Sequence, residues 1–475
     1  MRATKTINGA AARGLAGALA GGVLAIAAFA AGAVAGAQEV PAGRPAEGTA
    51  VKPAGPTSRP AGILQRLRRS TTGPAATRPT TRPAAGAQAG EGAGEETERS
   101  GFTRIQPRAE LTPAEYEAKA KALREAYAKP PAEWPKATID EGVKYVEIGL
   151  PEAPVFPAEN PYTEAKAELG RQLFFDPRLS GSGQIACASC HEAELGWSDG
   201  RTTSFGHGRA MLTRNSPTLN NIWARTSLFW DGRVKTLEDQ VMMPIVAQDE
   251  MRSDPDEVVK RLAADPKYVR RFKAVFDDGA DPAKADDAKA VTMERVAKAV
   301  ATFERTIVSR TSAFDRFLKG KHDALSDSAV RGLHLFRTDA RCANCHMGPT
   351  FSDEQFHNLG LTYYGRKLQD LGRYEVTKDA RDVGAFKTPS LRNLPRTGPY
   401  MHNGLFDLDG VLRMYNVGMP NIRPKPEQKG DPLFPVKSPL LKPLALNGRD
   451  LEDLRAFLDS LQETRLRVRP AEWAD

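Results

Sequence analysis

The chain has 475 residues, of which 40% are hydrophobic and 27% are charged, a composition typical of soluble globular proteins. Its length predicts two or three domains. The formal net charge of +8 lies in the first 108 residues, which hold 14 basic and 6 acidic side chains, whereas the rest of the chain holds 53 of each sign. Because the folded body is formally neutral, the charge does not indicate a nucleic-acid-binding protein, and we expect no nucleic-acid partner.

Residues 1–37 have the organisation of a secretory signal peptide. Arg2, Lys5 and Arg13 precede a run rich in Ala, Gly, Leu and Val, and small residues follow this run up to Gln38. Basic, apolar and small-residue segments in this order predict cleavage and export, so we expect the protein in the periplasm or otherwise outside the cytoplasm. Retention of the run as an N-terminal anchor is the alternative.

Residues 38–110 predict a disordered linker. The segment is rich in Pro, Ala, Gly, Thr and Arg and has few large apolar side chains, so it cannot bury a core. Its purpose stays open between a tether, a spacer and no function.

From Thr112 onward the sequence predicts a mainly α fold with long loops. Thr112 is an N-cap, Pro113 is the first helical residue and Glu115 is the third, which together make a capping box. Further helices are predicted over residues 163–175, 236–246, 254–265, 293–309, 326–337 and 449–462. Alternating strand patterns are nearly absent, which is why we expect few strands.

All four cysteines of the chain occur in two Cys-x-x-Cys-His motifs. Their residues are Cys187, Cys190 and His191 in the first motif, and Cys342, Cys345 and His346 in the second. This signature is typical of covalent haem c, because both thiols of one motif reach the vinyl groups of one porphyrin. The adjacent histidine then serves as the proximal ligand of the iron. The sequence therefore predicts two covalently bound haem c groups.

Two other interpretations of the motifs need to be weighed. A zinc site would use all four thiols, but each motif carries its own histidine and 155 residues separate the motifs. Structural disulfides would each close a very small loop and stabilise little.

A haem iron with one histidine ligand can take a sixth ligand, and the remaining histidines are candidates. His207 lies in a loop between Gly206 and Gly208, where it is either a ligand or an ordinary loop residue.

Longer segments around the motifs carry a family resemblance. They are "LGRQLFFDPRLSGSGQIACASCHEAELGWSDGR", "RNSPTLNN", "LFWDGR", "FRTDARCANCHMGPTFSDEQFHNLG" and "GAFKTPSLRNLPRTGPYMHNG". Together they resemble the bacterial dihaem cytochrome c peroxidases and their relative MauG, from about residue 150 to residue 465. The resemblance implies two cytochrome-c-like haem domains: an N-terminal peroxidatic domain over residues 111–324 and a C-terminal electron-transfer domain over residues 325–465. Residues 466–475 would form a tail.

The resemblance implies roles for residues around the first haem. His191 matches the proximal ligand of the peroxide-reacting haem, and His207 matches a distal ligand that leaves when the other haem is reduced. Trp230 matches the tryptophan that relays electrons between the haems. Gln240 and Glu250 match the polar pair over the peroxide site, where a carboxylate can carry a proton from one peroxide oxygen to the other. The sequence departs from the family just before Glu250, and a second carboxylate adjoins it.

The sixth ligand of the second haem distinguishes the two branches of the family. His346 matches the proximal ligand, and the opposite ligand is a methionine in the peroxidases and a tyrosine in MauG. With one residue fewer in this segment, Tyr415 falls on the ligand position and Met414 lies next to it. Adjacent helical residues do not share a face, so only one of them can bind, and we expect Tyr415. A phenolate lowers the potential of a haem, whereas a thioether raises it.

A calcium ion lies between the haems of the family. The matching ligands are the side chain of Asn215 and the backbone carbonyls of Thr397 and Pro399. Ligation by oxygen alone suits calcium. The alternative for Asn215 is an ordinary turn residue.

We therefore expect an exported dihaem peroxidase that reduces hydrogen peroxide to water, with electrons relayed from the C-terminal haem to the N-terminal haem. One alternative is a MauG-like oxidase that acts on a protein residue or a small molecule through high-valent iron. The other is a dihaem electron carrier without catalysis. The implied partners are a small electron-donor protein (a cytochrome c or a cupredoxin) or an oxidisable substrate, together with a possible second copy in a homodimer.

Overall fold

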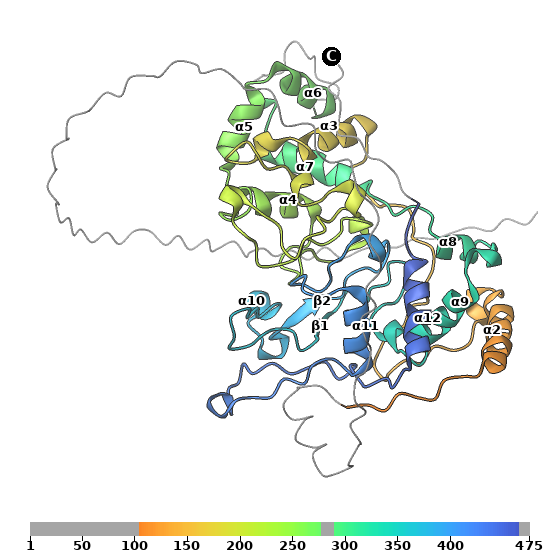
Figure 1. Ribbon diagram of the computed structural model, residues 1–475. Coiled ribbons are helices and arrows are strands. Elements are labelled where there is room, and N and C mark those ends of the chain that lie inside the picture. Colours follow the sequence, from red (N-terminus) through yellow and green to blue (C-terminus); the bar gives the residue numbers. More distant parts are fainter. Residues whose placement is uncertain (1–103, 277–288, 465–475) are drawn as a thin grey trace, which may run out of the picture. The chain divides into compact units, whose positions relative to one another are not determined.

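The computed structural model describes residues 104–276 and 289–464 (Figure 1). The predicted signal peptide, the predicted linker up to residue 103 and the predicted tail lie outside the described residues. No helix in the described ranges combines the length and the apolar character that a membrane span requires.

The described residues are mainly helical, as predicted. The α-helices are α2 (Pro113–Tyr127), α3 (Glu164–Phe174), α4 (Leu237–Val246), α5 (Pro255–Ala263), α6 (Pro266–Phe276), α7 (Met293–Arg305), α8 (Ala313–Leu318), α9 (Asp327–Arg337), α10 (Tyr374–Thr377), α11 (Leu408–Asn416) and α12 (Gly448–Asp459). Strands β1 (Phe356–Asn358) and β2 (Ala385–Lys387) form a small antiparallel sheet in which Phe356 lies opposite Lys387. Long loops and short 3-10 turns connect these elements.

Side-chain caps explain where the predicted helices begin. Thr112 accepts a hydrogen bond from the Glu115 backbone nitrogen at 3.3 Å, and the Glu115 carboxylate accepts one from the Thr112 nitrogen at 2.8 Å. Thr163, Thr236 and Ser326 cap α3, α4 and α9 in the same way. A cap satisfies backbone donors that have no partner inside the helix, which is why the sequence marks these positions clearly.

Two helix pairs repeat one packing arrangement. Helix α3 crosses α7 so closely that a Cβ atom added to Gly170 would lie 1.9 Å from the Ala299 carbonyl oxygen, and α9 crosses α12 with Gly332 1.9 Å from the Asp453 carbonyl oxygen by the same measure. A phenylalanine pair adjoins each crossing, since the ring centroids of Phe174 and Phe303 are 5.3 Å apart and those of Phe336 and Phe457 are 5.1 Å apart. The protein therefore uses the same packing of two helices twice. The α3–α7 pair flanks the first cysteine motif in sequence, and the α9–α12 pair flanks the second.

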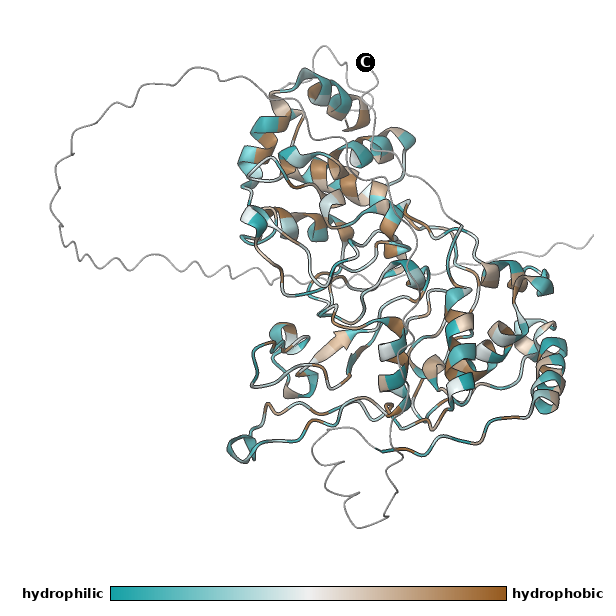
Figure 2. Ribbon diagram, in the orientation of Figure 1, coloured by the Kyte–Doolittle hydropathy of each residue, from teal (hydrophilic) through white to brown (hydrophobic). Residues whose placement is uncertain are grey.

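Each helix pair lies in a hydrophobic core of its own. The first core joins α3, α5, α6 and α7, and the second joins α2, α8, α9 and α12. In Figure 2, α7 is mostly brown where it passes between α3 and α4, whereas α2 is largely teal. The predicted domain boundaries remain a prediction, but the packing differs from them at α2 and α8, because Leu123 and Phe314 belong to the second core. Sequence position alone does not indicate which core α2 joins, because α2 packs against α9 and the segments of the first core lie between these two helices in the sequence.

Candidate functional site

The first cysteine motif presents a fixed imidazole. A 3-10 turn over Cys187–Ser189 leads into His191, whose Nδ1 lies 3.0 Å from the Trp197 carbonyl oxygen. Because a carbonyl oxygen only accepts hydrogen bonds, Nδ1 carries the proton and Nε2 keeps its lone pair. The Ser216 hydroxyl, which donates to the Cys190 carbonyl at 2.7 Å, lies 3.3 Å from the same Nδ1. An imidazole held through Nδ1 is oriented to ligate a metal through Nε2.

The second motif repeats this geometry. A 3-10 turn over Cys342–Asn344 leads into His346, whose backbone nitrogen donates to the Cys342 carbonyl at 2.8 Å. His346 Nδ1 lies 3.0 Å from the Phe351 carbonyl oxygen, which again leaves Nε2 free to bind a metal. None of the four cysteines forms a disulfide in the structure. Burial raises the pKa of Cys187 and raises that of Cys342 to about 12, which opposes the thiolate form that a zinc site needs.

A cavity of about 250 Å³ opens beside the second motif. Six of its lining residues bear on the argument, and they are Cys342, Cys345, His346, Trp230, Tyr415 and Leu458. Tyr415 lies in α11, and burial together with the two cysteine sulfurs raises the pKa of its phenol. Met414 does not line this cavity. Two thiols, an imidazole with a free nitrogen and a largely apolar wall are the features that a covalently bound haem requires, so the residues present fit that group.

Trp230 joins the two halves of the site. Its indole nitrogen donates to the Asn215 carbonyl at 2.9 Å, and its own carbonyl accepts from the Lys387 nitrogen of β2 at 2.8 Å. Because it also lines the cavity beside His346, Trp230 lies between segments that follow the first motif and segments that follow the second.

The three predicted calcium ligands line the same cavity. Asn215, Thr397 and Pro399 come from two distant parts of the sequence, and all three line this cavity. The Asn215 side-chain nitrogen donates to the Arg201 carbonyl at 2.8 Å, which leaves its Oδ1 as the ligand atom. The backbone nitrogen of Asn215 donates to the His402 carbonyl at 2.7 Å, so this residue is held from both sides.

His207 and Glu250 are also brought together. The His207 backbone nitrogen donates to the Glu250 carbonyl at 2.7 Å, and Gly206 has no room for a side chain because a Cβ atom would lie 1.8 Å from the Asp249 carbonyl oxygen. His207 Nδ1 is buried and has no hydrogen-bond partner among the described residues. Burial raises the pKa of Glu250, and Arg233 opposes that shift. Gln240 lies in α4, and no hydrogen bond in the described ranges joins it to Glu250.

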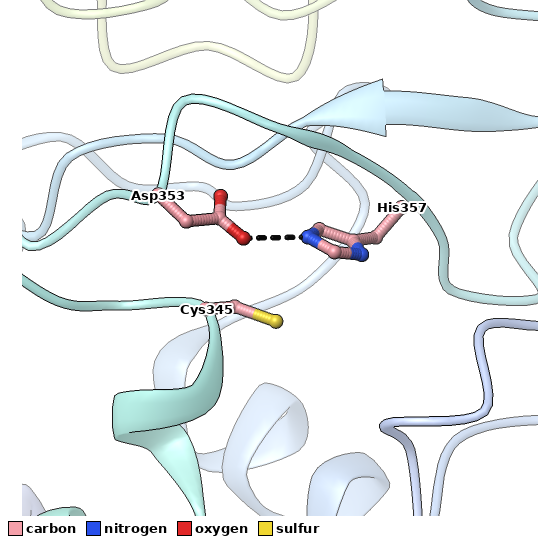
Figure 3. Close-up of side chains that lie close together, drawn as sticks. All are labelled: Cys345, Asp353 and His357. Atoms are coloured by element: carbon pink, nitrogen blue, oxygen red, sulfur yellow. Dashed lines mark hydrogen bonds and ion pairs between the residues drawn. The ribbon is translucent and has the colours of Figure 1, made fainter. Parts of the chain in front are cut away.

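The resemblance places His357 near the second haem with a hydrogen-bonding or packing role, but its partner Asp353 was not identified from the sequence. In Figure 3, Asp353 and His357 point toward each other beside Cys345, with His357 Nε2 2.8 Å from Asp353 Oδ2. Burial alone would lower the pKa of His357, but Asp353 and the Cys345 sulfur raise it to about 10. Donor atoms of these three residues lie within 4.8 Å of one another, so they also have the chemistry of a metal site. Nothing in the spacing of the sequence marked Asp353 as a partner.

The second unidentified group is a buried ion network on the cavity wall. Glu354 lies 2.5 Å from both the Arg225 guanidinium and the Lys387 ammonium, and the two cations line the cavity. The Glu354, Arg225 and Lys387 side chains are 14%, 9% and 6% exposed, so one carboxylate balances one of two cations away from water and the network keeps a net positive charge. The 129 residues between Arg225 and Glu354 hid this pair from sequence analysis.

Comparisons with known proteins agree with the two motifs. A family model described as di-haem cytochrome c peroxidase matches residues 164–323. The methylamine utilization protein MauG of Methylorubrum extorquens is 41% identical over 315 residues, which are 66% of this chain and 82% of that protein. The cytochrome-c peroxidase IdrP1 of Pseudomonas sp. strain SCT is 37% identical over 342 residues, which are 66% of this chain and 84% of that protein.

A solved structure is similar as well. The crystal structure of a MauG-like protein associated with microbial copper homeostasis matches with a TM-score of 0.58 and 32% identity, over 69% of this chain and 96% of that chain. The chain therefore belongs to the di-haem cytochrome c peroxidase and MauG family, and it is an oxidoreductase with two haems that acts as a peroxidase or oxidase.

Proposed function

We propose that the chain reduces hydrogen peroxide to water with two covalently attached haems. Cys187 and Cys190 would hold the first haem and Cys342 and Cys345 the second. The observation that carries the proposal is the repeated geometry of the motifs: each lies in sequence between the two helices of a closely packed pair, and each holds its histidine through Nδ1 with Nε2 free. A non-catalytic electron carrier would need this repeat, but it would not need the half-buried Glu250 near the first motif.

The chain's own side chains supply the proton chemistry of the first site. The iron held by His191 would bind the peroxide and supply electrons to it. Glu250 then takes the proton from the nearer peroxide oxygen and delivers it to the farther one, so that the O–O bond breaks with water as the leaving group. Gln240 orients the peroxide by hydrogen bonding. Each turnover consumes one peroxide, two electrons and two protons and yields two waters.

His207 would control access to this site. Its imidazole would cap the first haem in the resting protein and would move away on activation. The buried Nδ1, which has no hydrogen-bond partner among the described residues, supports this role, because protein contacts alone do not fix the ring. The backbone bond from His207 to Glu250 ties this movement to the catalytic carboxylate. Electrons would enter at the His346 site and reach the His191 site through Trp230.

Tyr415 would be the sixth ligand of the second haem. The support is that Tyr415 lines the cavity beside His346, whereas Met414 does not. A phenolate ligand stabilises ferric iron and lowers the haem potential, which favours the storage of oxidising equivalents. This observation favours a second candidate function, a MauG-like oxidase that withdraws electrons from a protein residue or small molecule.

Further features of the proposal concern binding partners and location. One calcium ion would be held by Asn215 Oδ1 and the carbonyls of Thr397 and Pro399, and these three residues line the same cavity. We propose an exported, periplasmic protein that receives electrons from a small cytochrome c or cupredoxin and that pairs as a homodimer. The two haem domains would be those predicted from the sequence, with α2 and α8 packed in the second core.

Addition of peroxide to the purified protein separates the candidate functions. Reaction only after one haem has been reduced supports a peroxidase in which His207 must leave. A long-lived, doubly oxidised state formed directly from the diferric protein supports the MauG-like oxidase. An absence of any spectral change in both forms would contradict both and leave the electron carrier.

A further inference from the structure

Helix α7 carries a buried glutamate that the proposed reaction does not use. Glu304 is 4% exposed, and its Oε2 has no hydrogen-bond partner among the described residues. A buried carboxylate without a partner is costly, so such a group holds a proton or faces a functional site. Helix α7 lies between α3 and α4 (Figure 1), within the half of the chain that holds the first motif.

The repeated helix pair shows what Glu304 faces. The crossing of α3 on α7 involves Ala299 and Phe303, and the crossing of α9 on α12 involves Asp453 and Phe457 in the same roles. The residue after each phenylalanine is therefore equivalent in the two halves, and the sequence has glutamate at 304 and leucine at 458. Leu458 lines the cavity beside His346.

Glu304 accordingly occupies the place of a cavity-lining leucine in the half with the first motif. A charge on Glu304 raises the pKa of the Cys187 thiol, which is consistent with a position on the side of α7 that faces the first motif. The second site has an apolar side chain where the first site has an acid, and the two sites therefore differ in proton chemistry at this one position.

The surroundings of Glu304 favour its neutral form. The charged groups that act on Glu304 are Arg305 on α7 and Glu238 on α4, and Glu304 in turn acts on Cys187 of the 3-10 turn. The Arg305 guanidinium is occupied by Glu238 at 2.7 Å, and the Lys166 ammonium by the Asn160 side chain at 3.0 Å. Helix α5 contributes the apolar Val258 and Leu262 to this core.

Burial raises the pKa of Glu304 to about 8, an effect that Arg305 opposes and Glu238 increases. The carboxyl therefore holds its proton at neutral pH, close to the point at which a nearby change of charge would alter its protonation.

We propose that Glu304 is the proton-binding group of the first haem site: in mildly alkaline solution, where part of the oxidised protein has released this proton, the carboxylate takes up one proton from solvent when one electron reduces the haem held by His191 and releases it on oxidation. The inference rests on the proposed attachment of haem at Cys187, Cys190 and His191. An added electron makes the site more negative, and in a poorly polarisable interior that charge favours protonation of a neighbouring carboxylate. By linkage the bound proton makes reduction easier, so each event promotes the other.

The test is a redox titration of the haem-loaded protein at several pH values. The reduction potential of the first haem is expected to fall as the pH rises through the range around 8. Reduction is coupled to proton uptake, and the proton concentration falls as the pH rises. Glu304→Gln and Glu304→Leu are expected to lose that part of the pH dependence. The second haem, with Leu458 at the equivalent position, serves as the internal control and should respond equally in all three proteins. An unchanged pH dependence of the first haem in both variants would overturn the proposal.

Infrared difference spectra provide a measurement that does not need a Glu304 variant to fold. Reduction of Glu250→Gln protein, labelled with ¹³C at its glutamates, is expected to produce a protonated-carboxyl band that shifts with the label. If no such band appears, Glu304 does not change protonation and the inference fails. Haem absorbance in the same sample keeps this outcome distinct from a failure of haem attachment, which would leave no haem to reduce.

Discussion

Which side chain of α11 faces the second motif decides the electronic character of that haem. Tyr415 lines the cavity and Met414 does not, although the two are neighbours in sequence. Phenolate and thioether ligands move a haem potential in opposite directions, within the roughly 0.8 V range that axial ligands command. A single helical position thus separates a site suited to accepting electrons from one suited to storing oxidising equivalents.

Replacement of this residue tests the assignment. Tyr415→Met is expected to raise the reduction potential of the second haem and to change its ferric absorption spectrum, because the anionic ligand is lost. Met414→Leu, the matched control, should leave both unchanged. Spectroelectrochemistry of the three proteins measures the effect, and a shift in the Met414→Leu protein alone would reverse the assignment.

A second residue prediction concerns the proton carrier at the first site. Glu250→Gln is expected to lower the rate of peroxide reduction by roughly 100-fold or more, which is the usual contribution of a positioned acid–base group. Asp249→Asn removes the adjacent, exposed carboxylate and is expected to keep most of the rate. Steady-state peroxide consumption with a reduced cytochrome donor distinguishes the two variants, and equal losses would show that charge rather than proton transfer matters.

The two cysteine motifs, which we propose attach haem, can be recognised in the sequence because the residues of each motif are close along the chain as well as in space. Cys187, Cys190 and His191 share one turn and need no knowledge of the fold. Asp353 and Glu304 could not be predicted as members of a site, since each meets its neighbours only after helices and loops from distant segments have packed. The ion pair between Arg225 and Glu354 escaped prediction for the same reason.

At the scale of elements, the crossings of α3 on α7 and of α9 on α12 are the contacts on which each haem half is built. A glycine at each crossing lets two backbones approach more closely than any side chain permits. The aromatic rings beside each crossing then fill the space between the helices. These pairs explain why the two motifs have the same geometry although their loops differ.

Gly170→Ala tests the role of the crossing. The added methyl would lie 1.9 Å from the Ala299 carbonyl oxygen, so the helices must separate, and we expect a loss of about 1–3 kcal/mol or more in the free energy of unfolding. Gly448→Ala, at the first position of α12 with nothing within 4 Å, is expected to be neutral. Denaturant unfolding of both variants measures the difference. Equal stabilities would contradict the importance of the close approach.

Helix α7 also gives a prediction for stability against pH. The pKa of Glu304 is about 8 in the folded protein and 4.5 for an ordinary glutamate, so the folded chain holds a proton that the unfolded chain has released. The stabilising effect of this proton is complete below pH 4.5 and is lost as the pH rises through about 8. The free energy of unfolding should therefore fall over this range by at most about 1.4 kcal/mol for each pH unit.

Glu304→Gln is expected to flatten this part of the stability curve. Denaturant titrations at about pH 5, 7 and 9 compare the variant with the unchanged protein. Parallel curves for the two proteins would contradict a raised pKa at this position.

The helices themselves could largely be predicted from the sequence, because their caps and apolar stripes are local features. Thr112 and Glu115 marked the start of α2 correctly. The core to which α2 belongs could not be predicted in this way, because Leu123 packs with residues from the far end of the chain. Helix α8 and the short β1–β2 sheet are too brief to leave a periodic pattern, so tertiary contacts determine them.

At the scale of the whole described chain, Trp230 and the predicted calcium ligands connect the two halves. The Asn215 carbonyl accepts a hydrogen bond from the Trp230 indole. The Asn215 side chain would bind calcium, so the proposed ion and the proposed electron path would share one residue. Loss of the ion would release Asn215 and with it the position of the indole.

Calcium removal is therefore expected to slow peroxide reduction that depends on electrons from the second haem. Treatment with a calcium chelator should lower the rate, and re-addition of calcium should restore it. Asn215→Ala should give a low rate that added calcium does not restore. A chelated protein with an undiminished rate would contradict the calcium assignment while leaving the haem sites untouched.

Mass spectrometry of proteolytic peptides from the purified, export-competent protein tests the central claim most directly. The account predicts two peptides with covalently attached haem, one that contains Cys187, Cys190 and His191 and one that contains Cys342, Cys345 and His346. Free thiols on both peptides, or a disulfide within either motif, would contradict covalent attachment and the electron path proposed between the two sites.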